Sequence, residues 1–278
     1  MEVVETIAAF RAAHGRLEGS LGFVPTMGFL HAGHMSLVEA AKGENRYVAV
    51  SIFVNPTQFG PNEDFSRYPR DPDRDLAMLR EAGVDLVLLP SVEEIYPAGA
   101  TTFVDPGPIA EVLEGKFRPG HFRGVATVVL KLFEIVRPHR AYFGRKDAQQ
   151  LVVIRRLVRD LNVDVEIVPV DTIREPDGLA LSSRNVYLSP AERQSALCLY
   201  RSLTLAQEMW TRGVRDAGTY RARMRDVIEA EESAAIDYIS VADPDSLEEL
   251  ERIKGPVLVS LAVRIGQTRL IDNVTLGA

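Results

Sequence analysis

The residues best suited to chemistry lie in one short segment, Pro25-Thr26-Met27-Gly28-Phe29-Leu30-His31-Ala32-Gly33-His34. An apolar run at residues 21–26 ends here and a helical pattern follows, so the segment joins a predicted first strand to a predicted first helix. Open α/β sheets bind ligands at the carboxyl ends of strands, and a helix N-terminus offers phosphate free N–H groups and a partial positive charge. One helical turn would place His31 and His34 side by side, where their imidazoles could donate hydrogen bonds to phosphate oxygens.

Two other interpretations of this pair are ordinary histidines at a helix start and a zinc site. Zinc is disfavoured because no third and fourth ligands lie nearby and Cys198 is the only cysteine. Two histidines, two glycines that permit close backbone approach, and a strand-to-helix junction coincide, which favours a nucleotide site. The chain contains neither G-x-x-x-x-G-K-[ST] nor G-x-G-x-x-G, so a P-loop and a dinucleotide fingerprint are excluded.

Two further segments could bind phosphate. In Gly144-Arg145-Lys146-Asp147, at another predicted strand end, Lys146 could reach a phosphate as a compact cation, whereas Asp147 is more simply explained as a helix cap. Leu181-Ser182-Ser183-Arg184-Asn185 offers two hydroxyls, a guanidinium and backbone amides for a phosphate clamp. Taken alone, this second segment is more typical of a solvated linker with a helix cap.

Two glutamines near predicted strand ends could recognise a hydroxyl or a carboxylate, although an isolated glutamine is usually a surface residue. They are Gln58, after the second strand, and Gln150, one turn into the helix after Asp147. Residues 118–124 form a basic, glycine-punctuated segment that is either a helix N-terminus or a cationic wall of the site.

Nearby aromatic residues, Tyr68 among them, are expected to serve mainly in packing. Asp71, Asp73 and Asp75 fit the dipole of a helix start, with a magnesium contact as the less favoured alternative.

Strand-like and helix-like patterns alternate over the first two-thirds of the chain, which predicts a parallel sheet covered on both faces. The expected strands are residues 21–26, 47–54, 85–89, 141–143 and 163–170, and the expected helices are 34–42, 71–83, 122–136 and 147–161. After residues 174–178 the pattern changes to helices at 189–210 and 216–233, followed by strands at 236–241 and 256–271 that fold back near Gly266. The predicted fold class is therefore α/β. It has a Rossmann-like parallel-sheet nucleotide-binding domain over residues 1–180 and a smaller α+β C-terminal domain over residues 181–278.

Length and charge exclude several classes of protein. The 278 residues carry 32 basic and 39 acidic side chains, a net charge of −7, which argues against a general nucleic-acid binder but not against a small anionic ligand. No apolar stretch approaches the roughly 18 residues of a membrane helix, so no membrane association is expected. The N-terminus is acidic where a signal peptide would be basic, so we expect a cytoplasmic location.

These segments together resemble the pantoate–β-alanine ligase family. The resemblance covers nearly the whole chain and is carried by residues 25–34, 53–59, 68–76, 120–125, 144–151, 174–185 and 237–241. The histidine motif alone is shared by a wider nucleotidyltransferase superfamily. The family resemblance implies ATP-dependent condensation of (R)-pantoate with β-alanine, giving pantothenate, AMP and pyrophosphate through a pantoyl adenylate.

The resemblance also assigns residues to substrates. It places Met27, Gly28, Phe29, Leu30, His31, Ala32, Gly33 and His34 along the ATP site, with Gly144, Arg145, Lys146 and Asp147 on the nucleotide loop, Ile173 at the adenine, and Leu181, Ser182, Ser183 and Arg184 as a lid over the triphosphate. It implies that His34, His31, Lys146 and Arg184 are catalytic, with His34 as proton donor, and that Gln58 and Gln150 hold pantoate or β-alanine.

Magnesium would accompany ATP, held mostly by phosphate oxygens and water, and no protein metal ligand is predicted. A homodimer is implied, as is a C-terminal domain that covers the site. Arg145 stands where the family usually has Glu, and Leu181 replaces a frequent Met.

Two alternatives remain open from the sequence. One is a nucleotidyltransferase of the same superfamily acting on a phosphorylated acceptor, and the other is a non-catalytic nucleotide-binding protein. Gln58 and Gln150 favour a small hydroxy acid, since a phosphorylated acceptor would require more cations.

Overall fold

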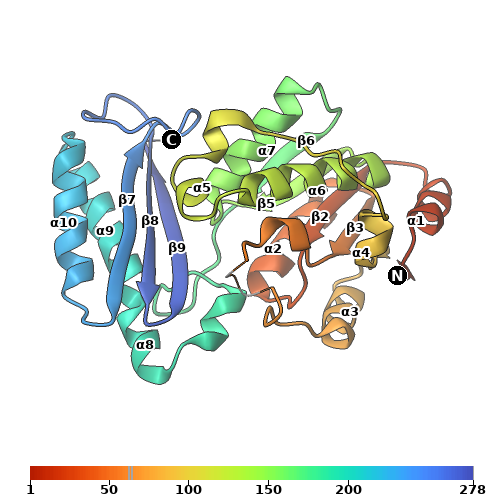
Figure 1. The fold of residues 1–278 in the computed structure, drawn as a ribbon, viewed down its shortest axis with the longest axis horizontal. Coiled ribbons are helices and arrows are strands. Elements are labelled where there is room, and N and C mark those ends of the chain that lie inside the picture. Colours follow the sequence, from red (N-terminus) through yellow and green to blue (C-terminus); the bar gives the residue numbers. More distant parts are fainter. Residues whose placement is uncertain (62, 64, 278) are drawn as a thin grey trace.

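The computed structural model describes residues 1–61, 63 and 65–277, which form two bodies that lie side by side (Figure 1). The first contains a six-stranded sheet in the order β1-β4-β3-β2-β5-β6, in which every pairing is parallel. Its strands are β1 (Glu2–Val4), β2 (Leu21–Thr26), β3 (Tyr47–Ile52), β4 (Leu86–Leu88), β5 (Arg140–Gly144) and β6 (Glu166–Val170).

Helices cover both faces of this sheet, which explains why its central strands are nearly all apolar. On one face α1 (Ile7–His14), α6 (His121–Val136) and α7 (Ala148–Asp160) pack against the strands, and on the other α2 (Ala32–Glu44) and α3 (Pro72–Glu81) do so. Shorter segments are α4 (Val92–Ile95), α5 (Glu114–Phe117), η1 (Pro56–Gln58) and η2 (Gly107–Ala110). The predicted parallel sheet is confirmed, whereas β1 and α1 were not predicted.

The strand order reverses beside β2, because the chain runs from β2 to β3 on one side and later returns to β5 on the other. The carboxyl ends of β2 and β5 therefore border a switch point, where loops diverge and leave a crevice. The segments that follow these two strands carry the paired histidines and Lys146.

The second body has an antiparallel sheet of β7 (Ala234–Ala242), β8 (Val257–Ile265) and β9 (Thr268–Leu276). The turn between β8 and β9 contains Gly266, as predicted. Its helices are α8 (Pro190–Ser195), α9 (Leu197–Thr211) and α10 (Ala217–Glu229), preceded by η3 (Ser183–Tyr187). The single helix predicted at 189–210 is two helices that meet at Ala196. A separate hydrophobic core joins α9 and α10 to the sheet.

Ion pairs connect the two bodies. Arg269 of β9 donates to both carboxylate oxygens of Glu114 in α5, at 2.6 and 2.8 Å, and also to Asp237 of β7 at 2.6 Å.

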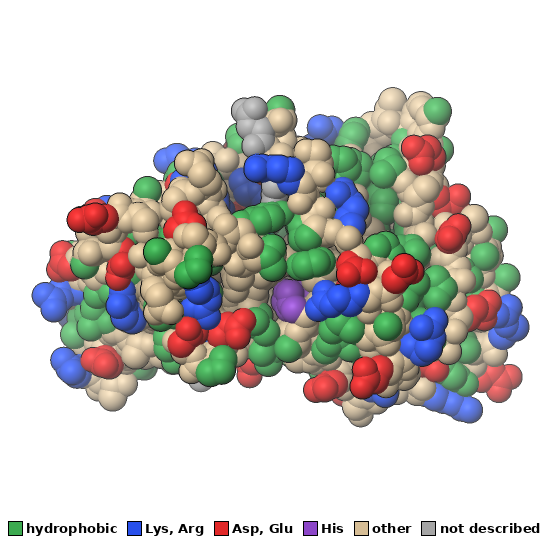
Figure 2. Space-filling view, turned by 90° about the horizontal axis from the view of Figure 1, so that it is seen from below, with side chains coloured by type: hydrophobic (Ala, Val, Ile, Leu, Met, Phe, Trp, Pro, Cys, Tyr) green, Lys and Arg blue, Asp and Glu red, His purple; other side chains and the backbone are tan. Residues whose placement is uncertain are grey.

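Figure 2 shows acidic and basic side chains interspersed over one face of the molecule, with hydrophobic side chains and a histidine near the middle. In the described part of the chain, no helix combines the length and apolar character that crossing a bilayer requires.

One buried carboxylate shapes the loop between β2 and α2. Asp75, 1% exposed, accepts hydrogen bonds from the N–H groups of Phe29 and Leu30, each at 2.7 Å. The loop turns through left-handed backbone at Gly28 (φ 80°) and Phe29 (φ 50°), which aims these consecutive N–H groups at one acceptor. The helix-dipole explanation is therefore incomplete for Asp75, whereas Asp71 is the N-cap and accepts from the Arg74 N–H.

We expect Asp75→Asn to lower the free energy of unfolding by about 2–3 kcal/mol. The asparagine oxygen can still accept from one of the two N–H groups, but its NH₂ group faces the other and that hydrogen bond is lost. A buried hydrogen bond to a charged group is worth about 1.5–3 kcal/mol. Urea unfolding of both variants measures the change. The control is Asp73→Asn on the exposed side of the same helical turn, expected within about 0.5 kcal/mol of the parent. Equal losses in both variants would contradict the assigned role.

Candidate functional site

Two cavities, each of about 190 Å³, share a wall at the carboxyl edge of β2 and β5. The first cavity is lined by His31, Gly33, Gly144, Lys146, Asp171, Thr172, Ile173, Leu181, Ser182 and Ser183, among others. The second cavity is lined by Asn55, Gln58, Arg118, His121, Val125, Val128, Val129 and Leu132, among others. Residues that line both are Pro25, Met27, His34, Tyr68, Phe143, Asp147, Gln150 and Arg184. Ligands in the two cavities would therefore meet beside His34.

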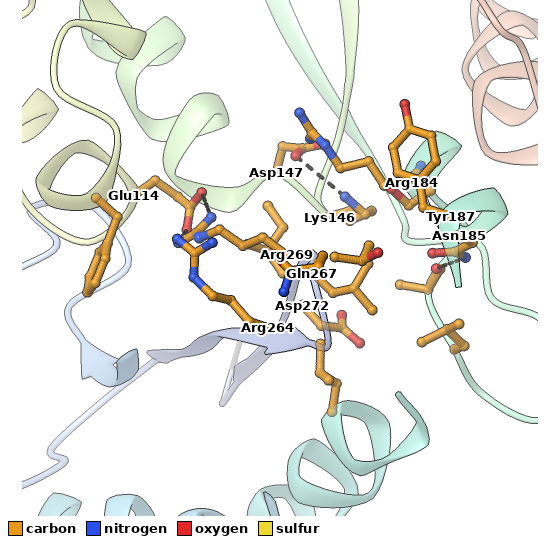
Figure 3. A pocket seen from close by; sticks show the side chains of 18 of the residues that line it. Glu114, Lys146, Asp147, Arg184, Asn185, Tyr187, Arg264, Gln267, Arg269 and Asp272 are labelled. Atoms are coloured by element: carbon orange, nitrogen blue, oxygen red, sulfur yellow. Dashed lines mark hydrogen bonds and ion pairs between the residues drawn. The ribbon is translucent and has the colours of Figure 1, made fainter. Parts of the chain in front are cut away.

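A third cavity, of about 380 Å³, lies between the two bodies and shares Lys146, Asp147, Ser182 and Arg184 with the first cavity. Figure 3 shows Lys146 and Asp147 on one side of it, with Arg269 and Asp272 of β9 facing them across the space. The residues shared by the first and third cavities thus supply two cations and a hydroxyl, with one carboxylate, Asp147, next to Lys146. This composition suits an extended polyanion such as a triphosphate.

The start of α2 fixes both histidines through backbone hydrogen bonds. His31 is the N-cap, and its Nδ1 accepts from the Gly33 N–H at 3.1 Å, while His34 Nδ1 accepts from the His31 N–H at 3.3 Å. The ring centroids lie 4.1 Å apart, which confirms the predicted side-by-side placement. Because each Nδ1 accepts, each neutral ring carries its proton on Nε2 and can donate only from that atom.

Burial sets the protonation state of this pair. Loss of solvent, together with His31 and Lys146 nearby, lowers the pKa of His34 to about 3. The same causes, burial first and then Lys146, lower the pKa of His31 to about 4. Both rings are therefore neutral at pH 7 and act as Nε2–H donors, without the desolvation cost of a buried imidazolium.

Lys146 and Asp147 lie in the short loop between β5 and α7. Lys146 Nζ is 3.6 Å from Asp147 Oδ1, and both line the first and third cavities (Figure 3). The prediction that Asp147 caps α7 is wrong in one respect: it occupies the N-cap position, but its side chain makes no capping bond. Its carboxylate is instead directed to Lys146. Arg145 points elsewhere and pairs with Asp171 at 3.0 Å.

The segment after residue 180 wraps the other side of the first cavity. The Leu181 N–H donates to the Ile173 carbonyl at 3.0 Å, and Ser182 caps η3 by accepting from the Arg184 N–H at 3.3 Å. These contacts place Ser182, Ser183 and Arg184 on the cavity, so this segment is more than a solvated linker.

Buried amide groups form the polar end of the second cavity. Asn55 Nδ2 donates to Gln58 Oε1 at 3.0 Å and to the Gly124 carbonyl at 3.2 Å, which leaves the Gln58 Nε2 beside Met27 Sδ at 2.9 Å. A Cβ on Gly124 would lie 2.3 Å from the Thr57 carbonyl oxygen, so glycine is required where α6 meets η1. Amides are thereby held beside the apolar wall that α6 provides.

A histidine and an arginine close the same end of the second cavity. His121 Nδ1 lies 2.8 Å from the Gln58 carbonyl oxygen, and burial with the nearby Arg118 lowers the pKa of His121 to about 3. Arg118 pairs with Glu63 at 2.5 Å. Residues 118–124 therefore fit both interpretations: they contain the start of α6, at His121, and Arg118 and His121 line the second cavity. The second cavity suits a small ligand with one polar end and a branched apolar body.

Not all the expected ATP-site residues are brought together. Gly28 and Phe29 line a separate pocket of about 260 Å³, beside Asp75. Leu30 is 1% exposed and packs in the core of the first body. Among the described residues, Leu30, Ala32 and Arg145 are not part of the walls of the first cavity. The other expected residues of the histidine, Lys146 and Ser182 segments, with Ile173, do line it.

Several site residues were missed. Asn55 and His121 line the second cavity and lie inside segments that the sequence analysis identified as candidates. Their polar side chains, close to a glutamine and a glycine, could have marked them as site residues. Tyr68 was expected to serve mainly in packing; it is 6% exposed and packs edge-on against Phe59, yet it lines both cavities.

We expect the ring signals of His31 and His34 to stay unchanged between pH 8 and about pH 5, because both pKa values lie near 3 to 4. Proton NMR over this range, with His31→Gln and His34→Gln for assignment, measures it, and the urea-unfolded chain, whose histidines titrate near pH 6.5, is the control.

Between about pH 6.5 and pH 4, His31 and His34 bind protons in the unfolded chain but stay neutral in the folded one. The free energy of unfolding should therefore decrease as the pH falls through this range. A folded-state midpoint near pH 6.5 for both rings would contradict this.

Paired histidines and a lysine at the carboxyl edge of a parallel sheet, with Ser182, Ser183 and Arg184 lining the same cavity, are typical of an α/β nucleotide-binding enzyme. A family model described as pantoate-beta-alanine ligase matches residues 2–275, and the chain belongs to this family.

A pantothenate synthetase of Roseiflexus castenholzii is 60% identical over 278 residues, covering 100% of both chains. The crystal structure of pantothenate synthetase from Thermus thermophilus superposes with a TM-score of 0.94 at 50% identity, covering 99% of each chain. That of the pantoate-beta-alanine ligase from Francisella tularensis, complexed with beta-gamma ATP and beta-alanine, has a TM-score of 0.81 at 38% identity and covers 99% of this chain and 97% of that one.

Proposed function

We propose that the chain joins (R)-pantoate to β-alanine with the cleavage of ATP, through a pantoyl adenylate. The ligation is the activity of the family to which the chain belongs, and ATP and β-alanine occur in the complex of the Francisella relative. The observation that carries the two-step route is the wall shared by two cavities of different chemistry, with His34 in it.

In this proposal the nucleotide occupies the first cavity, with its adenine toward Ile173 and its phosphates toward Lys146, Ser182, Ser183 and Arg184. The neutral Nε2–H groups of His31 and His34 donate to phosphate oxygens as charge develops there, and preorganised donors of this kind are a main source of catalysis.

Magnesium would be bound through ATP. The described residues contain no group of three potential metal ligands, and the Asp147 carboxylate lies 3.6 Å from Lys146 Nζ. The ion would neutralise phosphate charge.

Pantoate would lie in the second cavity. Its branched apolar carbon chain would lie against the valines of α6, and its hydroxyls against the amides of Gln58 and Gln150. Its carboxylate then attacks the α-phosphorus beside His34, and pyrophosphate leaves. The amine of β-alanine next attacks the acyl carbon, the acyl–phosphate C–O bond breaks, and AMP leaves with the oxygen. The residues that line both cavities bring the two reacting groups next to each other beside His34, and closure of the C-terminal cover over them would limit hydrolysis of the anhydride.

The second cavity argues against a phosphorylated acceptor. Of the two arginines that line it, Arg118 is paired with Glu63 at 2.5 Å, and Arg184 also lines the first cavity, where this proposal directs it to the phosphates of ATP. A phosphorylated acceptor in the second cavity would have to compete with Glu63 for Arg118 or with the nucleotide for Arg184.

We further propose that residues 1–180 bind ATP and pantoate, that residues 181–278 act as a cover, and that the protein works in the cytoplasm as a homodimer, as the family resemblance implies. The third cavity, between the two bodies, supports the cover role, since its walls come from both.

Isotope exchange tests this proposal. Labelled pyrophosphate should enter ATP when pantoate is present and β-alanine is absent, because the adenylation is reversible. Omission of pantoate should abolish the exchange. As a control, His34→Ala should lower the exchange rate by about 10²–10³-fold, the range for loss of one transition-state donor. Absence of exchange in a protein that binds ATP would turn the assignment toward another acceptor or a non-catalytic role.

Gln58→Ala should raise the KM for pantoate by about tenfold, the equivalent of about 1.4 kcal/mol, and leave the KM for ATP within about twofold. The effect should be confined to pantoate because Gln58 lines the second cavity and not the first. Steady-state kinetics with each substrate varied measures both values. Gln194→Ala, exposed on α8, is the matched control and should change neither. An effect confined to ATP would refute the assignment.

A further inference from the structure

The loop that carries Lys146 is held by a residue of the second body. Asn273 lies on β9, is 8% exposed, and donates from Nδ2 to the carbonyl oxygens of Arg145 at 3.0 Å and Lys146 at 2.7 Å. The two partners are 128 and 127 residues away in the sequence. A single amide group therefore fixes two successive peptide units, one on each side of the Lys146 Cα.

The preceding residue of β9 anchors a second segment of the first cavity. Asp272 has a side chain 1% exposed and forms a bidentate pair with Arg174 at 2.6 and 2.9 Å. Arg174 directly follows Ile173, which lines the first cavity. Asp272 Oδ1 also accepts from the Asn273 N–H at 2.8 Å, which orients both side chains together. Neighbouring residues of β9 thus hold two segments that line the first cavity, the Lys146 loop and the chain next to Ile173.

Other contacts also restrain the Lys146 loop. The Arg145 N–H donates to the Val170 carbonyl at 2.8 Å, the Asp147 N–H reaches the Gly144 carbonyl at 3.3 Å, and the Asp147 carbonyl accepts from the Leu151 N–H at 3.0 Å. The Arg145 and Lys146 side chains pair with Asp171 and Asp147. As noted, the Asp147 side chain does not cap α7. The carbonyl oxygens of Arg145 and Lys146, however, both accept from Asn273, so the orientation of the two peptide units beside the Lys146 Cα depends in part on this contact. Rotation of either unit would leave a carbonyl without that donor.

We propose that Asn273 is a positioning residue that fixes the Lys146 loop and so directs the Lys146 ammonium group to the phosphate end of the first cavity. The inference rests on the proposed function, in which Lys146 contacts the phosphates. It means that the nucleotide site of the first body is completed by the sheet of the second. A site geometry misplaced by about 1 Å can cost about 10²-fold in rate, so the expected effect is large for a residue that lines neither the first nor the second cavity.

The test uses two variants, Asn273→Ala and Asn273→Thr. Threonine keeps the strand propensity of the position, but its short side chain cannot donate to the carbonyls of both Arg145 and Lys146. Each is made in the parent chain and in Lys146→Ala, and the rate of pantoate-dependent pyrophosphate–ATP exchange is measured. The control is Val274→Ala, the next residue of β9, which packs against the core of the second body. Hydrogen exchange of the amides of residues 145–147 is measured on the same proteins without ligand.

We expect Asn273→Ala and Asn273→Thr to lower the maximal exchange rate about 10–100-fold in the parent and less than twofold in the Lys146→Ala background, since positioning residues couple to the group they hold. The amides of residues 145–147 should exchange faster in these variants and not in Val274→Ala. Equal losses in both backgrounds, an unchanged rate, or unchanged amide exchange would overturn the inference. Failure of the parent chain to catalyse isotope exchange would overturn the proposed function instead, and the amide measurement would then decide the role of Asn273 alone.

Discussion

The carboxylate of Asp75 binds two consecutive N–H groups of the loop after β2, and the placement of both histidines depends on this contact. The loop must leave the strand, turn through left-handed backbone and enter α2 within a few residues. Without an acceptor, the N–H groups of Phe29 and Leu30 would face the protein interior unpaired. With it, α2 begins at a fixed point, and the Nδ1 atoms of His31 and His34 are occupied by the backbone of the same turn.

Burial then gives the histidine pair its chemical character. An exposed imidazole would change charge near neutral pH, but these rings stay neutral because solvent is excluded and Lys146 is near. The positive charge of the site therefore resides on the lysine and arginine side chains, and the histidines supply directed dipoles. Under the proposed function, this division would let the site bind a polyanion without burying two further cations beside Lys146.

Much of this arrangement is local and could be predicted from the sequence. Strand and helix periods, the His-x-x-His spacing and the Pro at the start of α3 are properties of adjacent residues, and they indicated the parallel sheet and the helical histidine pair. Contacts over long sequence separations could not be predicted in this way. Asp75 reaches Phe29 across 46 residues and Asn273 reaches Lys146 across 127, and neither side chain differs locally from an ordinary surface polar group. The missed β1 has three residues, too few for a period, although Thr6 caps the missed α1.

The wall shared by the two cavities affects how long a bound molecule stays on the protein. A molecule in which an acid and a nucleotide are covalently joined would contact both cavities at once, and its second contact would be intramolecular, at the effective concentration set by the linkage. Its affinity would exceed that of either fragment, because the translational and rotational entropy of association is lost only once. Such a linked species would dissociate slowly for as long as its bond persists. Once the bond is broken, each fragment keeps the contacts of one cavity and can leave by itself.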